Sequence, residues 1–209
     1  MGGRPRRQPP RRLDRRGPKR SPKTKIVVVC EGKVTKPQYF SELARHYGSL
    51  ISMNLIIKEG SGVPLSILRK ARELMQHPED DFGRNDQVWA VFDRDEHPEV
   101  ARAINEATAA GISVGYSNPC FELWLVLHYR DHDAPVRRDQ IQRVLRSLMP
   151  GYNPRGSKEI TFAEICDAVE AAETRAEAMD VRRVRERNLR GNPSSTVYKL
   201  TREIRKHGK

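Results

Sequence analysis

The chain alternates short apolar runs with amphipathic segments, and this alternation is the feature that most restricts its fold. The first run, at 26–30, is an unbroken series of β-branched residues and a cysteine, as expected of a strand buried on both faces. Runs at 51–58, 86–92 and 112–116 predict three further strands. Segments with helical signals separate them. The order predicts an α/β fold with a mostly parallel sheet flanked by helices.

Helix signals fill the intervals between these runs. Helices are predicted at 35–47, 64–77, 98–111 and 121–129. Thr35 is the expected N-cap residue of the first, because its hydroxyl can accept a hydrogen bond from the helix N-terminus. Short connections between strands and helices restrict the topology further, since crossovers between parallel strands are right-handed.

The last third of the chain contains no strand-like run. Helical spacing is present at 137–148 and 161–179, and a final helix is predicted to start at Asn192-Pro193. We therefore expect three parts: a disordered basic tail at 1–23, an α/β core at 24–135, and a helical C-terminal portion at 136–209 that packs on the core.

The charge is distributed unevenly along the chain. The net charge is +12, yet residues 1–25 hold eleven Lys and Arg against one acid, and residues 181–209 hold ten against two, which leaves −6 on residues 26–180. Five prolines and few apolar residues in 1–23 predict disorder. An acidic middle flanked by basic ends fits a carboxylate site served by cationic segments that hold a polyanion.

Cysteine usage and hydropathy indicate a cytoplasmic protein. Cys30, Cys120 and Cys166 have no CxxC spacing and read as reduced, mostly buried residues. No apolar stretch approaches the roughly 20 residues of a membrane span, so no membrane partner is expected. The N-terminus lacks the apolar region of a secretory signal.

Acidic residues follow two of the predicted strands. Glu31 comes after the first, and Asp93 and Asp95 come after the third at an i, i+2 spacing that points both side chains the same way. Functional groups gather beyond the carboxyl ends of parallel strands, so these acids should meet at one edge. Clustered carboxylates repel unless a cation neutralises them, and oxygen ligands suit Mg²⁺ or Mn²⁺. An acidic, solvated turn is the simpler alternative.

Several segments resemble, in order, those of the RloB-like (AbiLii-related) family. The resemblance covers roughly residues 25–205, and its most specific part is the SNPCFELW segment. The matching segments are CEG with Thr35, Pro37, Tyr39 and Phe40; VFDRD at 91–95; SNPCFELWL at 117–125 with His128; and NPSST at 192–196.

The resemblance implies a Toprim-like fold and an activity on nucleic acid. Members are similar to Toprim domains, the metal-binding modules of topoisomerases, primases and the nucleases of the overcoming-lysogenization-defect type. The family is associated with restriction–modification loci and abortive phage resistance. It implies cleavage of DNA or RNA with Mg²⁺ or Mn²⁺, and a defence-system partner such as an ATPase or a restriction–modification subunit.

In this family pattern Glu31, Asp93 and Asp95 are the metal ligands and catalytic residues. The chain departs from the pattern at one position, because such sequences commonly carry another acid just after the threonine, where this chain has Lys36. Lys33 also stands where glutamate is frequent. The number of metal ions therefore stays open at this point, as does the activity of this copy.

Three further residues near these motifs are candidates for supporting roles. His97 follows the acidic cluster, and Glu122 and His128 lie on the apolar predicted helix. Glu122, an acid in an apolar run, must be exposed or paired, and it could lie beside the metal ligands. The two histidines are candidates for proton transfer, with a loop residue and a structural core histidine as the respective alternatives.

The predicted contacts to phosphate come from helix starts and basic residues. Asn118-Pro119 and Asn192-Pro193 each read as an N-cap followed by the first helical residue, and a helix N-terminus binds anions. Simple capping is the alternative. The candidates for binding phosphate or nucleic acid are Lys33, Lys36, Asn118, Arg183, Arg187, Asn192, Ser194, Ser195 and Thr196.

The sequence thus predicts a metal-dependent nuclease with a role in phage defence. Water would be the nucleophile, activated by a bound Mg²⁺ that also steadies the leaving oxygen. A non-catalytic nucleic-acid-binding or sensing subunit is the alternative that Lys36 and the basic ends favour. A glycosyltransferase that holds a sugar nucleotide through a DxD motif and Mn²⁺ is a third class.

Overall fold

A computed structural model describes most of the chain. The described residues are 24–48, 53–60, 63–76, 82–83, 85–94 and 97–207. The tail predicted at 1–23 and the candidate ligand Asp95 both lie outside these ranges.

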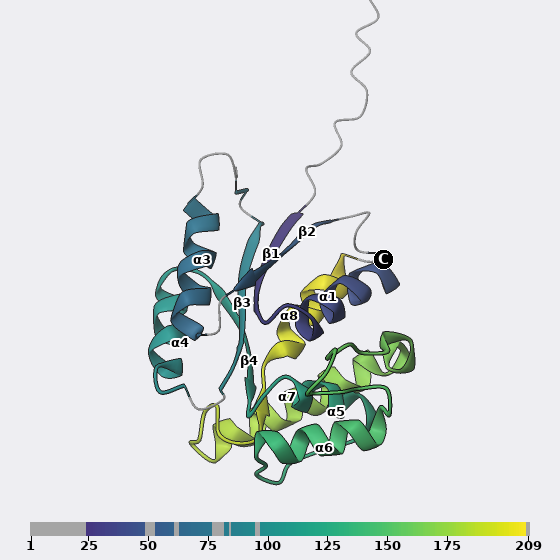
Figure 1. The fold of residues 1–209 in the computed structure, drawn as a ribbon. Coiled ribbons are helices and arrows are strands. Elements are labelled where there is room, and N and C mark those ends of the chain that lie inside the picture. Colours follow the sequence, from purple (N-terminus) through teal and green to yellow (C-terminus); the bar gives the residue numbers. More distant parts are fainter. Residues whose placement is uncertain are drawn as a thin grey trace, which may run out of the picture.

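The predicted α/β fold is confirmed. The sheet has the order β2-β1-β3-β4-β5, in which β1 to β4 run parallel and β5 pairs antiparallel with β4 (Figure 1). Its strands are β1 (Thr24–Glu31), β2 (Met53–Gly60), β3 (Gln87–Asp93), β4 (Ser113–Asn118) and β5 (Ser194–Ser195).

Helices cover both faces of this sheet. Figure 1 shows α3 and α4 on one face, and α1, α8 and the group α5 to α7 on the other. The helices are α1 (Thr35–His46), α3 (Pro64–Gln76), α4 (Val100–Ala109), α5 (Glu122–Tyr129), α6 (Arg138–Leu148), α7 (Val169–Arg185) and α8 (Val197–Lys206). Among the described residues, no helix is both long and apolar enough to cross a membrane.

Alternate residues of β1 explain why both faces need cover. Val27 and Val29 pack with α3 and α4, whereas Ile26, Val28 and Cys30 pack with the helices of the other layer. Successive side chains of a strand point to opposite faces, so a continuous apolar run requires a helix layer on each side. The core that contains Ile26, Val28 and Cys30 continues into the C-terminal helices. Residues from Val136 onward therefore share one hydrophobic core with β1.

The C-terminal portion is more than a set of helices. Ser194–Ser195 forms the edge strand β5. The prediction of one long helix at 161–179 is wrong for its first part. That part contains the short 3₁₀ helices Phe162–Glu164 and Cys166–Ala168. Helix α7 then begins at Val169 and ends at Arg185.

Both Asn-Pro motifs were predicted as helix starts, and both predictions are wrong. Asn118 is the last residue of β4, and α5 begins only at Glu122. Asn192 precedes β5, and α8 begins at Val197. Both Asn–Pro peptide bonds are cis. Neither motif is therefore the start of a helix.

Asn192 instead ties the C-terminal segment to the loop before α6. Its Oδ1 accepts the Val136 N–H at 3.0 Å, and its Nδ2 donates to the Val136 carbonyl at 2.7 Å. One amide side chain thus satisfies both backbone groups of a buried residue. This pair of bonds positions the start of α6 relative to the edge of the sheet.

We predict that Asn192→Ala destabilises the protein by about 1–3 kcal/mol, because it leaves two backbone groups of Val136 without partners. Urea unfolding followed by circular dichroism measures the change. Asn105→Ala, on the exposed face of α4, is the matched control and should leave the unfolding midpoint nearly unchanged. Equal midpoints for the two variants would contradict this role of Asn192.

Candidate functional site: carboxylates closed by a lysine

The carboxyl ends of β1, β3 and β4 meet at one edge of the sheet, as predicted from the strand order. Cys30 pairs with Val91, and Asp93 pairs with Ser117, so the ends of the three strands are level. Glu31 lies against Asp93, whose N–H donates to Glu31 Oε2 at 3.2 Å. The structure thus brings together two of the three predicted ligands, and Asp95 is outside the described residues.

Lys36 inserts its side chain between these two acids. Gly32 takes a left-handed conformation, with φ of 80°, and turns the chain from β1 toward α1. Helix α1 starts at Thr35, which is not the N-cap residue as predicted, because Val34 holds that position. Thr35 instead donates its hydroxyl to the Lys158 carbonyl at 2.7 Å. The next residue, Lys36, then points at the strand ends.

The ammonium of Lys36 makes a close ion pair in a nearly closed environment. Its Nζ lies 2.8 Å from Asp93 Oδ2 and 3.9 Å from Glu31 Oε2. The Lys36 and Asp93 side chains are only 7% and 6% exposed. The Phe121 ring lies beneath the same ammonium, with its centroid 5.7 Å away. The cation therefore has contacts on several sides and little access to water.

Burial and charge have opposite effects on Lys36. Burial by itself would lower the pKa of Lys36, but the negative charges of Asp93 and Glu31 outweigh it and raise that pKa above its ordinary value. Burial raises the pKa of Asp93, and the ammonium of Lys36 is the group that opposes this rise. Lys36 is therefore a permanent positive charge at this site.

The described residues do not fit a divalent cation in this arrangement. Mg²⁺ binds carboxylate oxygens at about 2.0–2.1 Å, so an ion on Asp93 Oδ2 would lie within about 5 Å of the ammonium. Repulsion between the two cations is about 7 kcal/mol at an effective dielectric constant of about 20. Among the described residues, no third acid joins Glu31 and Asp93 to bring three ligand atoms within 4.8 Å of one another.

Glu122 lines the same pocket, as its position in the sequence suggested. A hollow of about 280 Å³ contains it together with Glu31, Lys36 and Asp93. Glu122 Oε1 accepts hydrogen bonds from Gln142 and Tyr152, both at 2.7 Å.

These bonds decide the charge of Glu122. Burial alone would raise the pKa of Glu122, but hydrogen bonds from Tyr152, Cys120 and Gln142 lower it below its ordinary value. Glu122 is thus a satisfied carboxylate in the pocket wall.

His128 is a structural residue. Its Nδ1 lies 3.0 Å from the Trp124 carbonyl, which can only accept, so Nδ1 carries the proton. Its Nε2 then accepts from the Tyr39 hydroxyl at 3.0 Å. Trp124 is fully buried. The predicted alternative of a satisfied core histidine describes His128, and both its nitrogens are already in use.

The side chains predicted to bind phosphate are mostly buried or hydrogen-bonded within the fold, and the buried Ser194 Oγ has no hydrogen-bond partner among the described residues. Ser194 and Ser195 are 1% and 0% exposed in β5. Thr196 Oγ1 accepts the Tyr116 N–H at 3.0 Å, and Asn118 Nδ2 donates to the Arg190 carbonyl at 2.9 Å. Since no helix begins at these residues, the predicted phosphate site lacks its geometric basis.

The basic C-terminal segment, 181–209, also uses part of its charge in ion pairs within the fold. Arg183 is buried and forms ion pairs with Asp133 at 2.9 Å and with Glu186 at 3.2 Å. Arg187 is exposed and takes a left-handed conformation with φ of 55°. Arg183 therefore holds α7 against the loop before α6.

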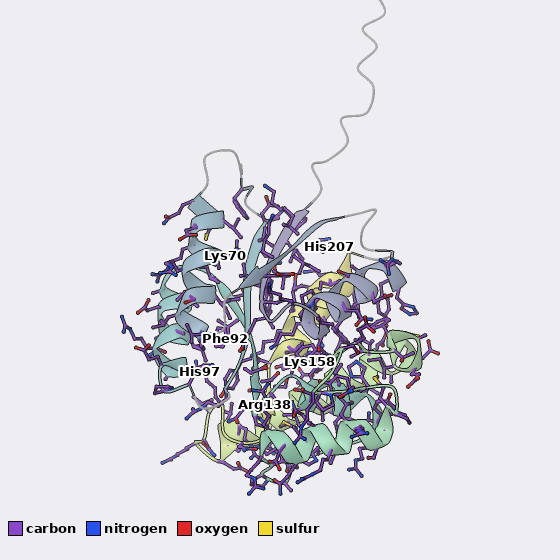
Figure 2. The ribbon with its side chains drawn as sticks, in the orientation of Figure 1. Lys70, Phe92, His97, Arg138, Lys158 and His207 are labelled. Atoms are coloured by element: carbon purple, nitrogen blue, oxygen red, sulfur yellow. The ribbon has the colours of Figure 1, made fainter. Side chains whose placement is uncertain are left out.

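Sequence reasoning missed the basic residues that surround the pocket. Arg138 borders both the acidic pocket and a second hollow of about 780 Å³, which His97, Asn118 and Asn192 also line. Figure 2 shows Arg138 between His97 and Lys158, near the end of β4. The arginines between 137 and 146 could have indicated this basic surface, but in the sequence that segment was used only to predict a helix.

The comparisons with known proteins identify the family. A family model described as RloB-like protein matches residues 26–204. The chain belongs to the RloB-like family. This membership suggests a defence-associated role. The chain has no significant match among curated proteins or among solved structures. The Toprim relationship stays a prediction.

We predict that Lys36→Met destabilises the protein by about 3–5 kcal/mol, because it leaves the buried carboxylate of Asp93 without its cation. Chemical unfolding at neutral pH measures the loss. Lys33→Met is the matched control, since the Lys33 side chain is 81% exposed and its loss should change stability by less than about 0.5 kcal/mol. Similar stabilities of the two variants would contradict the buried ion pair.

We also predict an acid-induced loss of stability from His128. Burial lowers the pKa of His128 from 6.5 to about 4 in the folded protein. The unfolded chain therefore takes up a proton first as the pH falls, and folding loses stability between pH 6.5 and 4. The loss is about 2 kcal/mol at pH 5.

Urea titrations at pH 7 and pH 5 measure this effect on the parent and on His128→Gln, whose amide can replace both hydrogen bonds. The variant should lose about 2 kcal/mol less than the parent on acidification. An identical loss in both proteins would show that His128 is not the group responsible.

Proposed function

We propose that this member of the RloB-like family binds nucleic acid without hydrolysing it, and that Lys36 takes the place of a divalent cation. The observation that carries the proposal is the 2.8 Å ion pair between Lys36 and Asp93 at the carboxyl edge of the sheet. It places a permanent charge where a nuclease of this pattern needs an exchangeable ion.

The hollows around α6 support a polyanion as the ligand. The 780 Å³ hollow shares Arg138 with the acidic pocket, and it shares Asp139 and Gln142 with a third hollow of about 290 Å³. Eight basic and four acidic side chains line the three hollows together. A concave surface with an excess of positive charge attracts the phosphate backbone of nucleic acid.

Three of these basic side chains have no acid within ion-pair distance in the described part of the chain. Arg146 and Arg155 line the third hollow, and Lys158 lines the acidic pocket. All three are exposed. Charges without a protein counterion are available to phosphate, whereas the ion-paired Arg183 is not. We therefore place the nucleic-acid interface on α6 and residues 155–158.

A cleavage assay tests the absence of hydrolysis. Purified protein is incubated with labelled DNA and RNA in Mg²⁺ or Mn²⁺, and binding is measured on the same samples. We expect binding of at least one nucleic acid and no cleavage with either ion. Cleavage by the parent that Asp93→Asn abolishes would overturn the proposal in favour of a nuclease.

A triple alanine variant at Arg146, Arg155 and Lys158 tests the interface. The slope of log affinity against log salt should become shallower by roughly two to three units, because each lost phosphate contact removes about 0.7–0.9 of a unit. The matched control neutralises three basic residues of β2 and α3, Lys58, Arg69 and Lys70. Figure 2 shows Lys70 on the opposite side of the sheet. Equal slopes for both variants would contradict this interface.

A metal-dependent nuclease is the second candidate, and one observation favours it. Asp93 Oδ1 is buried and has no hydrogen-bond partner among the described residues. An unpartnered carboxylate oxygen is open to a ligand such as a metal ion. Exchange of Lys36 for the acid common in the family examines this candidate.

We expect Lys36→Glu to bind Mn²⁺ at least about tenfold more tightly than the parent, because it removes the repelling ammonium and adds a ligand. Isothermal titration calorimetry measures the affinity, with Lys36→Met as the control for loss of the charge alone. Mn²⁺ binding to the parent that equals binding to Lys36→Glu would show that the lysine does not exclude the ion.

A further inference from the structure

Three potential metal ligands meet on the side of the molecule where α1 ends, apart from the acidic pocket. His46 is the last residue of α1, and Cys166 and Asp167 belong to the 3₁₀ helix that leads into α7. One ligand atom from each lies within 4.8 Å of the other two. Among the described residues, this is the group of three that could hold a metal ion.

The spacing within the group is close to that of a zinc site. Cys166 Sγ lies 3.7 Å from Asp167 Oδ1. Two tetrahedral ligands at zinc distances of about 2.3 Å for sulfur and 2.1 Å for oxygen are about 3.6 Å apart. The thiol and the carboxylate are therefore already separated as they would be on one ion. An adjustment of roughly 1 Å closes the longest separation, and the exposed His46 side chain can make it by rotation.

The ligand atoms are available to a metal ion. His46 makes edge contacts with the rings of Tyr47 and Phe162, with centroids 4.8 and 6.1 Å apart. No hydrogen bond to its ring nitrogens is made within the described part of the chain, so the nitrogens are available to a metal ion. The Cys166 thiol donates only weakly, to the Ala163 carbonyl at 3.4 Å and to Asp167.

The chemistry of the donors selects the metal. A thiolate, an imidazole and a carboxylate are ligands of Zn²⁺, whereas Mg²⁺ and Mn²⁺ prefer oxygen alone. Three protein ligands leave the fourth tetrahedral position for water. The thiolate and the carboxylate together neutralise the charge of the ion.

We propose that His46, Cys166 and Asp167 form a zinc-binding site that ties the end of α1 to the segment before α7. The two segments are about 120 residues apart in the sequence. The metal would link α1, the helix that also carries Lys36, to the segment before α7. Binding to the folded state alone stabilises that state by mass action. This site is independent of nucleic-acid binding and of any ion at Glu31 and Asp93.

Cysteine alkylation in the full-length protein gives a specific test. Cys30 and Cys120 are 0% exposed, so Cys166 is the cysteine that reacts with iodoacetamide in the folded state. Equimolar Zn²⁺ should slow this reaction at least about tenfold, because the coordinated thiolate is shielded. Mass spectrometry of the labelled peptide measures the rate. An unchanged rate in the presence of zinc would overturn the proposal.

Cobalt substitution gives the second readout, since a thiolate bound to Co²⁺ produces a charge-transfer band in the near ultraviolet. We expect this band in the parent and its absence in Cys166→Ser. His46→Ala should weaken Zn²⁺ binding at least about tenfold in a chelator-competition assay. Glu164→Gln, an exposed acid of the same segment, is the matched control and should bind as the parent does. Parental affinity in Cys166→Ser and His46→Ala would show an adventitious ion only.

Discussion

The pairing of β1 with β3 in a sheet buried on both faces governs the chemistry of this protein. Apolar side chains occupy the strands as far as Cys30 and Phe92, so the first polar residues appear where the strands leave the core. Parallel pairing in register then forces Glu31 and Asp93 together. Two carboxylates in this position cannot both be ionised without a cation, and the fold supplies one from the first turn of α1.

The choice of a lysine as that cation has consequences for function. A metal ion exchanges with solvent and can polarise a phosphate, whereas an ammonium bound through α1 is permanent and acts only as a charge. Lys36 can therefore hold the strand ends together. The desolvation of two charged groups is offset by their close contact and by the second acid, Glu31.

The basic residues near α6 and α7 show that a count of charges along the sequence does not locate a basic surface. Residues 181–209 are strongly basic in the sequence, yet Arg183 of this segment is used to hold α7 to Asp133. Among the described residues, Arg146 of α6 and Arg155 and Lys158 of the segment after it line the hollows without an acid within ion-pair distance. Charge density along a sequence does not report ion pairing, because the partner acids lie elsewhere in the chain.

The sequence by itself determined the α/β class, the positions of the four parallel strands and the meeting of Glu31 with Asp93. These follow from local periodicity and from the rule that parallel strands end at one edge. Only the tertiary structure decided that Lys36 enters the gap, that Asn118 and Asn192 end a strand and brace a loop, and that Ser194 and Ser195 form a buried edge strand. The physical reason is that a polar side chain is satisfied by whichever partner packing brings to it, and local pattern carries no record of contacts between residues distant in the chain.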